Sequence, residues 1–217
     1  MTDAVIFDLD GVIVDSEPVW EEVRRRYVAE HGGTWQPDSQ RRLMGMSTRE
    51  WARYLSAELG VDRTPEQVAA DVIDEMARRY AERLPLIPGA DEVVRRIAAG
   101  WTLGLASSSP TRLIDAALAA TGLAEVFAVT LSTERVERGK PAPDVYVAVA
   151  RRLAADPVRC VAVEDSSNGV RSAAAAGMRV VAVPHEAYPL DPDAAEKATI
   201  VLPGVTELTE ETIRSLP

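Results

Sequence analysis

The sequence has 217 residues, of which 47% are hydrophobic and 27% charged, the balance of a globular protein with one large domain or a core and a smaller insert. Lys and Arg number 24 against 34 Asp and Glu, and the formal net charge of −10 disfavours nucleic acid as a partner, because an acidic surface repels phosphate backbones. Cys160 is the only cysteine, and we find neither a secretory signal nor an apolar stretch long enough to span a bilayer, so we expect a soluble cytoplasmic protein with no disulfide and no membrane partner.

Six short apolar runs along the chain are typical of buried β-strands. Their Val-rich, non-alternating character indicates parallel strands that are covered on both faces. Helical patterns fill most gaps after the first, and this alternation predicts an α/β fold with a doubly wound parallel sheet. The expected strands are residues 4–7, 102–106, 126–131, 160–163, 180–183 and 200–202, and the expected helices of the sheet are residues 110–120, 143–154 and 168–176.

Residues 15–84 break this alternation, because they hold several amphipathic helical patterns and no convincing strand. Thr64 and Gln67 offer a capping box for the last of these helices, with Pro65 at its first position. We therefore predict two units, an α/β core of residues 1–14 and 85–217 and an α-helical insert of residues 15–84. The expected helices of the insert are residues 17–30, 48–59 and 64–83.

Polar and charged residues follow four of the predicted strands or their connections. Because ligands of parallel sheets gather outside the carboxyl ends of the strands, we expect these residues to converge on one rim. Taken singly, Asp8 and Asp10 are also good turn formers, and Ser109 before Pro110 is an ordinary helix cap. Taken together, they favour a functional site. The residues are Asp8, Asp10, Ser107, Ser108, Ser109, Lys140, Glu164 and Asp165.

The chemistry of these residue types points to a metal ion and a phosphoryl group. Carboxylates from two strand ends form a site for a hard cation, and Mg²⁺ typically takes one or two carboxylates together with substrate phosphate. A lysine ammonium and serine hydroxyls suit phosphoryl oxygens. Only Lys140 and Lys197 among the basic residues are lysines, and since an ammonium and a guanidinium are not interchangeable, the position of Lys140 favours function over chance.

Four motifs, in this order, resemble those of the haloacid dehalogenase-like (HAD) hydrolase superfamily. The resemblance covers essentially the whole chain, and it implies a Rossmann-like core with a small α-helical cap inserted after the first strand. The motifs are matched by FDLDGVIVDSE (7–17), LASSSP (105–110), GKPAPDVY (139–146) and VEDSSNGVRSAAAAGM (163–178).

The resemblance implies a phosphatase that hydrolyses a small sugar or organic-acid phosphate. Asp8 is then the nucleophile that takes the phosphoryl group as an aspartyl-phosphate. Asp10 is the general acid for the leaving oxygen and later the base for water. Family members that cleave carbon–halogen bonds lack the second aspartate of this pair, so the presence of Asp10 indicates phosphoryl transfer.

The resemblance also implies how the remaining residues are used. Mg²⁺ is expected on Asp8, the backbone carbonyl of Asp10 and Asp165, with Glu164 supporting these ligands without binding the ion. The groups expected to bind the transferring phosphoryl group are Ser107, Ser108 and Lys140. We expect a small phosphorylated metabolite as the partner, and a monomer or weak dimer.

Specificity is expected to come from the cap. Arg49, at the start of a helix after a glycine-containing loop, is either a ligand of the substrate or a solvated charge, and the sequence favours neither. The run 24–26, three consecutive arginines, has the character of a solvated helix face. Trp20, Trp35 and Trp51 are expected to build the small core of the cap.

Three other functions are less favoured by the sequence. Mutases of the β-phosphoglucomutase branch share these motifs, but they carry a histidine early in the first cap helix and a lysine later in the cap, whereas residues 15–84 contain no lysine. A non-catalytic protein on this fold is expected to have lost one of the motif residues, and none is missing. A P-loop is disfavoured because the sequence has no Gly-x-x-x-x-Gly-Lys-Ser/Thr.

Overall fold

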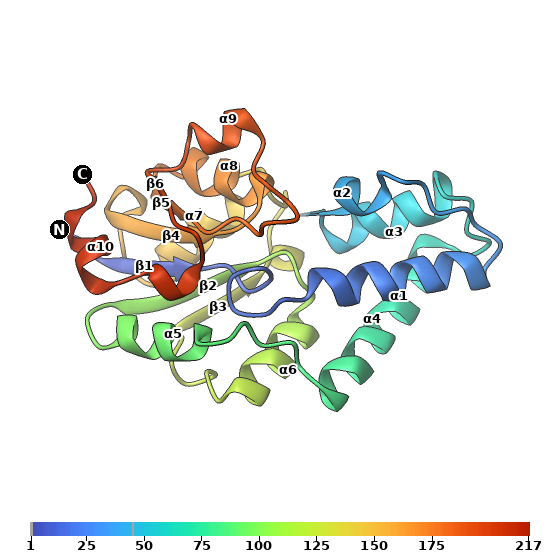
Figure 1. Ribbon diagram of the computed structural model, residues 1–217, viewed down its shortest axis with the longest axis horizontal. Coiled ribbons are helices and arrows are strands. Elements are labelled where there is room, and N and C mark those ends of the chain that lie inside the picture. Colours follow the sequence, from blue (N-terminus) through green and yellow to red (C-terminus); the bar gives the residue numbers. More distant parts are fainter. Residues whose placement is uncertain (1, 45) are drawn as a thin grey trace.

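The computed structural model describes residues 2–44 and 46–217, and a six-stranded sheet forms its centre (Figure 1). Every pair of neighbouring strands is parallel, in the order β3-β2-β1-β4-β5-β6. This arrangement confirms the predicted doubly wound α/β fold. The strands are β1 (Ala4–Phe7), β2 (Thr102–Ser107), β3 (Val129–Ser132), β4 (Cys160–Glu164), β5 (Arg179–Ala182) and β6 (Ile200–Val201).

Helices cover both faces of the sheet because its strands are apolar on both sides. In β1, Val5 and Phe7 pack toward one set of helices while Ala4 and Ile6 pack toward the other, as the alternation of side chains along a strand requires. One face carries α5 (Ala90–Ala98), α6 (Thr111–Thr121) and α10 (Glu210–Ser215), and the other carries α7 (Asp144–Arg152), α8 (Ser167–Ala175) and α9 (Pro192–Ala195). Three short 3-10 helices complete the core, η1 (Thr133–Arg135), η2 (Pro157–Arg159) and η3 (Val205–Glu207).

Four helices lie between β1 and α5 and form a separate body beyond the end of the sheet (Figure 1). The last of them begins as predicted, because Thr64 and Gln67 exchange side-chain and backbone hydrogen bonds. The two chain segments that lead into and out of this body run side by side, since Val14 and Leu86 form an antiparallel bridge. The helices are α1 (Glu17–Glu30), α2 (Ser39–Leu43), α3 (Thr48–Ala57) and α4 (Pro65–Glu82).

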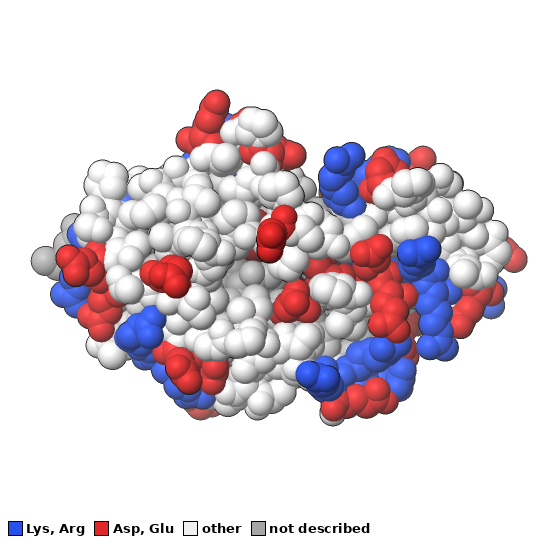
Figure 2. Space-filling view, in the orientation of Figure 1, with Lys and Arg blue, Asp and Glu red and all other residues white. Residues whose placement is uncertain are grey.

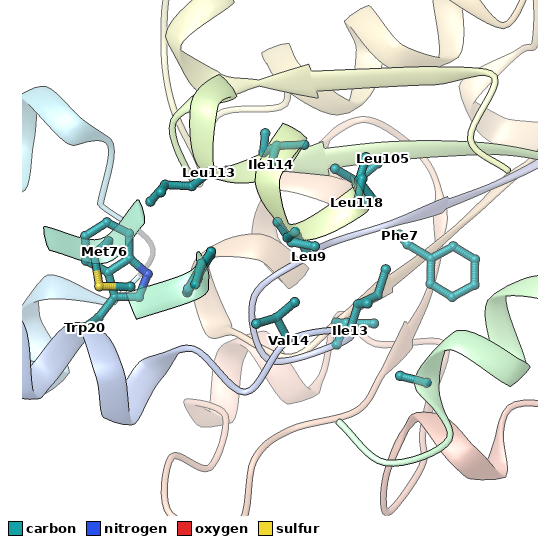
Figure 3. Packing of buried hydrophobic residues seen from close by; sticks show 14 of the residues in the cluster. Phe7, Leu9, Ile13, Val14, Trp20, Met76, Leu105, Leu113, Ile114 and Leu118 are labelled. Carbon is teal, nitrogen blue, oxygen red and sulfur yellow. The ribbon is translucent and has the colours of Figure 1, made fainter. Parts of the chain in front are cut away.

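The helical body is packed onto the core and is not only tethered to it. Helix α4 packs along α6, and Arg112 of α6 pairs with Asp74 of α4 at the surface. Figure 3 shows apolar side chains running from Phe7 in the sheet past Leu9 to Trp20 and Met76 in the helical body. A single buried apolar cluster therefore joins the two parts.

Several elements differ from the sequence prediction. The structure contains α2 and α5, which we did not predict, and β3 begins three residues later than expected. The backbone amide of Val126 donates to the carbonyl of Leu123 and closes a turn that ends at Val126, and Phe127 packs edge-on against Phe7 at 6.2 Å between ring centroids. The apolar character that suggested a strand there is used for packing against β1.

Acidic and basic side chains are intermixed over α1 and α4 on the face shown in Figure 2. Arg79 bridges Glu22 of α1 and Glu75 of α4, and Arg78 pairs with Glu75 and Glu82. The excess negative charge is therefore broken up by ion pairs on this side. Among the described residues, we find no helix that is both long and apolar enough to cross a membrane.

Candidate active site

The predicted site residues meet at the carboxyl ends of the central strands. Asp8 follows β1, and its amide continues the ladder by donating to the carbonyl of Val163 in β4 at 2.9 Å. Glu164 is the last residue of β4, and Asp165 follows it directly. Because β1 lies between β2 and β4, these groups come from adjacent strands and face one another.

Lys140 lies at the centre of this cluster and contacts several of its groups. Its ammonium donates to Asp8 Oδ1 at 2.9 Å, to Glu164 Oε1 at 2.6 Å and to the carbonyl of Ala106 at 3.0 Å, which uses all three of its N–H groups. Burial by itself lowers the pKa of Lys140, but the carboxylates of Asp8 and Glu164 outweigh it, and the pKa is raised above its ordinary value. Lys140 is therefore a permanent positive charge at the end of β1.

Glu164 is fully buried, and both of its oxygens are engaged. Oε1 accepts from Lys140 and from the hydroxyl of Tyr146 at 2.9 Å, while Oε2 accepts from the amides of Asp165 and Ser166 and from the Ser166 hydroxyl. A Cβ on Gly169 would lie 1.8 Å from Oε1, so only glycine lets α8 pass this close to the carboxylate. Glu164 is consequently fixed as a support for Lys140 and for the turn that carries Asp165.

Asp8, Glu164 and Asp165 form a cluster of hard oxygen donors. One oxygen from each lies within 4.8 Å of the others, and all three residues are buried. Burial raises the pKa of Asp165, and the neighbouring carboxylates raise it further. Burial also raises the pKa of Asp8, although the positive charge of Lys140 opposes this shift. Three carboxylates face one ammonium, and this donor set fits a divalent cation such as Mg²⁺.

The loop after β1 is shaped by the same cluster. Gly11 has a φ of 75°, and a Cβ there would lie 2.0 Å from Asp165 Oδ2. A side chain at position 11 would therefore suffer both backbone strain and a collision. Since the oxygens of Glu164 are occupied by hydrogen bonds, the carboxylates of Asp8 and Asp165 are the ones in this cluster that are open to a metal.

Asp10 has different neighbours from Asp8. Its Oδ1 accepts from the hydroxyl of Ser16 at 2.5 Å, and its Oδ2 accepts from Ser109 at 2.8 Å and Ser107 at 3.2 Å. These hydroxyls hold the carboxylate of Asp10 away from the acidic cluster. The side chain of Asp10 therefore lies outside the group of carboxylates that fits the cation.

The serines after β2 differ in their hydrogen bonds. The hydroxyl of Ser107 accepts from the amide of Ser109 at 2.9 Å in addition to contacting Asp10. The hydroxyl of Ser108 is buried and has no hydrogen-bond partner within residues 2–44 and 46–217, although it borders the same pocket as Asp8 and Lys140. An unpaired hydroxyl at this point suits a phosphoryl oxygen.

The helical body closes over these groups and leaves a cavity of about 40 Å³. That volume holds about three water molecules and is too small for a sugar phosphate. The core side of the cavity is formed by the strand-end residues described above. The side facing them is lined by Glu17, Trp20, Arg24, Leu43, Met46 and Trp51.

Two of the arginines in the helical body are placed differently from one another. Arg49 is exposed and borders a separate groove together with Glu137 and Gly139, so it is not among the residues lining the cavity. Arg24 was expected on a solvated helix face, and that expectation is wrong, because Arg24 is only 5% exposed and borders the cavity. Of the three consecutive arginines, Arg25 and Arg26 are exposed as expected.

A signal for Arg24 was present in the sequence. The buried residues of α1 are Trp20, Val23, Arg24, Tyr27 and Val28, which follow the spacing of one helix face. An arginine within such a stripe is directed inward by the helix geometry. Trp20 and Trp51 do build the interior as predicted, with ring centroids 5.9 Å apart, and Trp35 is partly buried against the same cluster.

Comparison with known proteins decides the family. A family model described as haloacid dehalogenase-like hydrolase matches residues 2–177. The chain belongs to the haloacid dehalogenase-like hydrolase family. The resemblance found in the four motifs is thereby confirmed, and hydrolases of this family generally use a metal ion, for which the buried carboxylates described above are the matching group.

Two curated relatives of this hydrolase are phosphatases of similar length. It is 35% identical over 185 residues to the phosphorylated carbohydrates phosphatase of Thermotoga maritima, covering 84% of this chain and 86% of that one. It is 34% identical over 213 residues to hexitol phosphatase B of Escherichia coli O157:H7, covering 95% and 94%. These relatives confirm the prediction of a phosphoric monoester hydrolase.

A solved structure extends the comparison to the fold. The β-phosphoglucomutase of Clostridium difficile superimposes with a TM-score of 0.84 over 99% of this chain and 96% of that chain, at 22% identity. At this identity the likeness concerns the fold alone. It places the helical body of α1–α4 and the α/β core in a known arrangement.

Proposed function

We propose that this hydrolase is a Mg²⁺-dependent phosphatase of small phosphorylated carbohydrates that works through an aspartyl-phosphate on Asp8. The observation that carries the proposal is the buried cluster in which Lys140 contacts Asp8 and Glu164 while Asp165 lies beside them. The carbohydrate class is supported by the relatives named for phosphorylated carbohydrates and hexitol phosphates.

The residues divide into binding and reacting groups. Lys140 and the hydroxyl of Ser108 bind the phosphoryl oxygens, whereas the hydroxyl of Ser107, expected in the same role, is engaged with Asp10 and the amide of Ser109. Lys140 opposes the repulsion between the nucleophile and its anionic target. A carboxylate oxygen of Asp8 attacks phosphorus, a bond from that oxygen to phosphorus forms, and the bond to the ester oxygen breaks. Asp10 gives its proton to the departing alcohol oxygen.

The second step reverses the part played by Asp10. Its carboxylate, oriented by the serine hydroxyls, takes a proton from a water molecule as that water attacks phosphorus. The acyl-phosphate bond breaks, inorganic phosphate leaves, and Asp8 regains its carboxylate. The two aspartates thus act from different surroundings, which is what attack and proton transfer require.

Asp8, Asp165 and the backbone carbonyl of Asp10 are the groups that we propose to hold Mg²⁺, with Glu164 supporting them. When bound, the ion neutralises charge that Lys140 alone leaves uncompensated in this cluster. Arg49 does not line the cavity in this structure. It would bind the substrate only if residues 15–84 were placed differently relative to the core.

We further propose that residues 15–84 form a cap that opens for each substrate. The linkers pair at the proposed boundaries, where the amide of Asp15 donates to the carbonyl of Pro85 at 2.7 Å and the amide of Ile87 donates to the carbonyl of Ile13 at 2.9 Å. The cavity is smaller than a sugar phosphate, so substrate entry requires that the cap move away from the core.

The metal requirement tests this proposal. Treatment with EDTA should abolish hydrolysis of p-nitrophenyl phosphate, and Mg²⁺ should restore it. Asp165→Asn should weaken Mg²⁺ binding, measured by titration calorimetry, by at least about tenfold. Asp115→Asn, an exposed aspartate of α6 with no ion pair among the described residues, is the matched control and should bind Mg²⁺ normally. Full activity in metal-free protein would contradict the proposal.

A further inference from the structure

We propose that Arg24 and Glu17 form a subsite in the cap that binds hydroxyl groups on the carbon chain of the substrate. The preferred substrate is then the monophosphate of an uncharged polyol or sugar, and a compound with a second anionic group is disfavoured. This inference rests on the proposed phosphatase activity and specifies its substrate class.

The first observation is the setting of the Arg24 side chain. Its guanidinium carbon lies 4.3 Å from the ring centroid of Trp20 and 5.1 Å from that of Trp51. Packing on aromatic rings holds a guanidinium by its faces and leaves its N–H groups available in its own plane. Trp20 and Trp51 therefore fix the direction of Arg24 without using its hydrogen-bond donors.

The second observation is that these donors are not used by the part of the chain that the structure describes. Arg24 forms no hydrogen bond and no ion pair there, and its buried Nε has no partner. Burial lowers the pKa of Arg24 to about 10, against the attraction of Glu17 and Asp10, so the side chain stays charged at neutral pH. A buried, unpaired cation is costly, and a ligand in the adjoining cavity supplies the missing acceptors.

The third observation is the acceptor beside it. Glu17 begins α1, and its Oε2 accepts a hydrogen bond from Gln40 Nε2 at 2.6 Å, which orients the carboxylate. Glu17, Trp20 and Arg24 are spaced three and four residues apart and so share one face of α1. Glu17 and Arg24 border the same cavity without forming an ion pair with each other.

This pair of charges decides the chemical class of the ligand. A hydroxyl group donates to the Glu17 carboxylate and accepts from the Arg24 guanidinium, so neighbouring hydroxyls satisfy both residues. A second phosphate or a carboxylate is attracted by Arg24 but repelled by Glu17, which is ionised above about pH 7, the range in which the substrates are compared. The subsite is thus suited to a neutral polar chain.

The test uses three six-carbon phosphates that differ only along the chain. Glucitol 6-phosphate carries a hydroxyl on each carbon that does not bear the phosphate. In 6-phosphogluconate a carboxylate replaces the terminal hydroxymethyl group, and hexyl phosphate has no hydroxyls. We expect the wild-type kcat/KM for glucitol 6-phosphate to exceed that for 6-phosphogluconate by at least about tenfold, the effect of about 1.4 kcal/mol.

The variants isolate Arg24. Arg24→Met keeps much of the packing on the tryptophans but removes the donors, and it should lower the ratio of kcat/KM for glucitol 6-phosphate to that for hexyl phosphate by roughly 10- to 100-fold, mainly through KM. Arg24→Lys keeps the charge without the planar fork and should give an intermediate ratio. Arg25→Met, the exposed neighbour on the same helix, is the control and should leave the ratio unchanged.

The possible outcomes separate the inference from the activity on which it rests. An unchanged substrate ratio in Arg24→Met, or a wild-type preference for 6-phosphogluconate, overturns the subsite while the phosphatase stands. Failure of the wild type to hydrolyse any of the three compounds overturns the phosphatase and the subsite together. Thermal melting is measured for each variant, and if Arg24→Met is unfolded, a wild-type ratio in Arg24→Lys overturns the subsite.

Discussion

At the scale of single residues, two aspartates separated by one residue lie in different surroundings. Asp8 contacts the ammonium of Lys140 within a group of carboxylates, whereas Asp10 is held by the hydroxyls of Ser16, Ser107 and Ser109. Side chains at positions i and i+2 of an extended segment point the same way, but β1 ends at Phe7 and the chain bends at Leu9, between the two aspartates, which separates them. One residue type can therefore serve both as a nucleophile and as a proton carrier.

Glu17 supplies a prediction about pH and stability. Burial, only partly offset by Arg24, raises the pKa of Glu17 from 4.5 to about 7. Between these values the unfolded chain has released the proton while the folded protein keeps it, so raising the pH favours unfolding. The ionised carboxylate therefore destabilises the fold above about pH 7, and below the unfolded pKa it has no effect.

Glu17→Gln removes this titration while keeping the size of the side chain. The variant should be more stable than the wild type by roughly 2 kcal/mol at about pH 8 and nearly equal at about pH 4, as measured by urea denaturation of metal-free protein. A stability difference that does not change with pH would contradict the burial of Glu17 as an acid. Glu21→Gln, four residues along the same helix, is a control for removing a negative charge from α1.

At the scale of elements, the N-terminal turn of α8 is built around Glu164. Ser166 caps the helix by accepting from the amide of Gly169 at 3.1 Å, and the same serine donates to Glu164 Oε2. Strand β4 and helix α8 are thus locked together through one carboxylate. The close approach of α8 depends on the absence of a side chain at Gly169.

Gly169→Ala should therefore destabilise the protein, although alanine is the better helix former. The new Cβ would meet a carboxylate that cannot move without breaking its hydrogen bonds, and we expect a loss of about 1–3 kcal/mol together with reduced activity. Thermal unfolding and turnover are the measurements. Gly204→Ala, where no atom lies within 4 Å of the added Cβ, is the control; equal behaviour of the two variants would contradict this packing.

Some of the elements and site residues can be predicted from the sequence, and others cannot. The strands of the sheet were predictable because buried parallel strands are continuous apolar runs, and Asp8, Lys140 and Asp165 were predictable as a group because strand ends converge. Helix α2 is only five residues long, too short for a helical period to be recognised. Arg24 was missed because its charge was given more weight than its place in the apolar stripe of α1.

At the scale of the whole molecule, the helical body of α1–α4 and the α/β core are joined by paired linkers and by one apolar cluster. Helix α4 packs along α6, and Arg112 and Asp74 form an ion pair at the surface of this contact (Figure 1). An exposed ion pair contributes little to stability. The apolar contact is therefore the main interaction that must be broken in the cap opening that we propose.

The residues of the helical body indicate that the protein does not catalyse the mutase reaction. The mutase branch uses a histidine early in the first cap helix and a lysine later in the cap, whereas α1 places Trp20 beside the cavity and residues 15–84 hold no lysine. With β-glucose 1-phosphate we therefore expect release of inorganic phosphate without glucose 6-phosphate, as followed by a coupled dehydrogenase assay. Formation of glucose 6-phosphate would identify the protein as a mutase.

The covalent intermediate gives the most direct test of the proposed chemistry. Wild-type protein mixed with Mg²⁺ and a ³²P-labelled hexitol phosphate is quenched with acid during turnover, and the labelled peptide is identified. We predict label on the peptide that contains Asp8, released by hydroxylamine as an acyl-phosphate, absent in Asp8→Asn and retained in Asp115→Asn. Release of phosphate by the wild type with no label on Asp8 at any quench time would contradict the proposed mechanism.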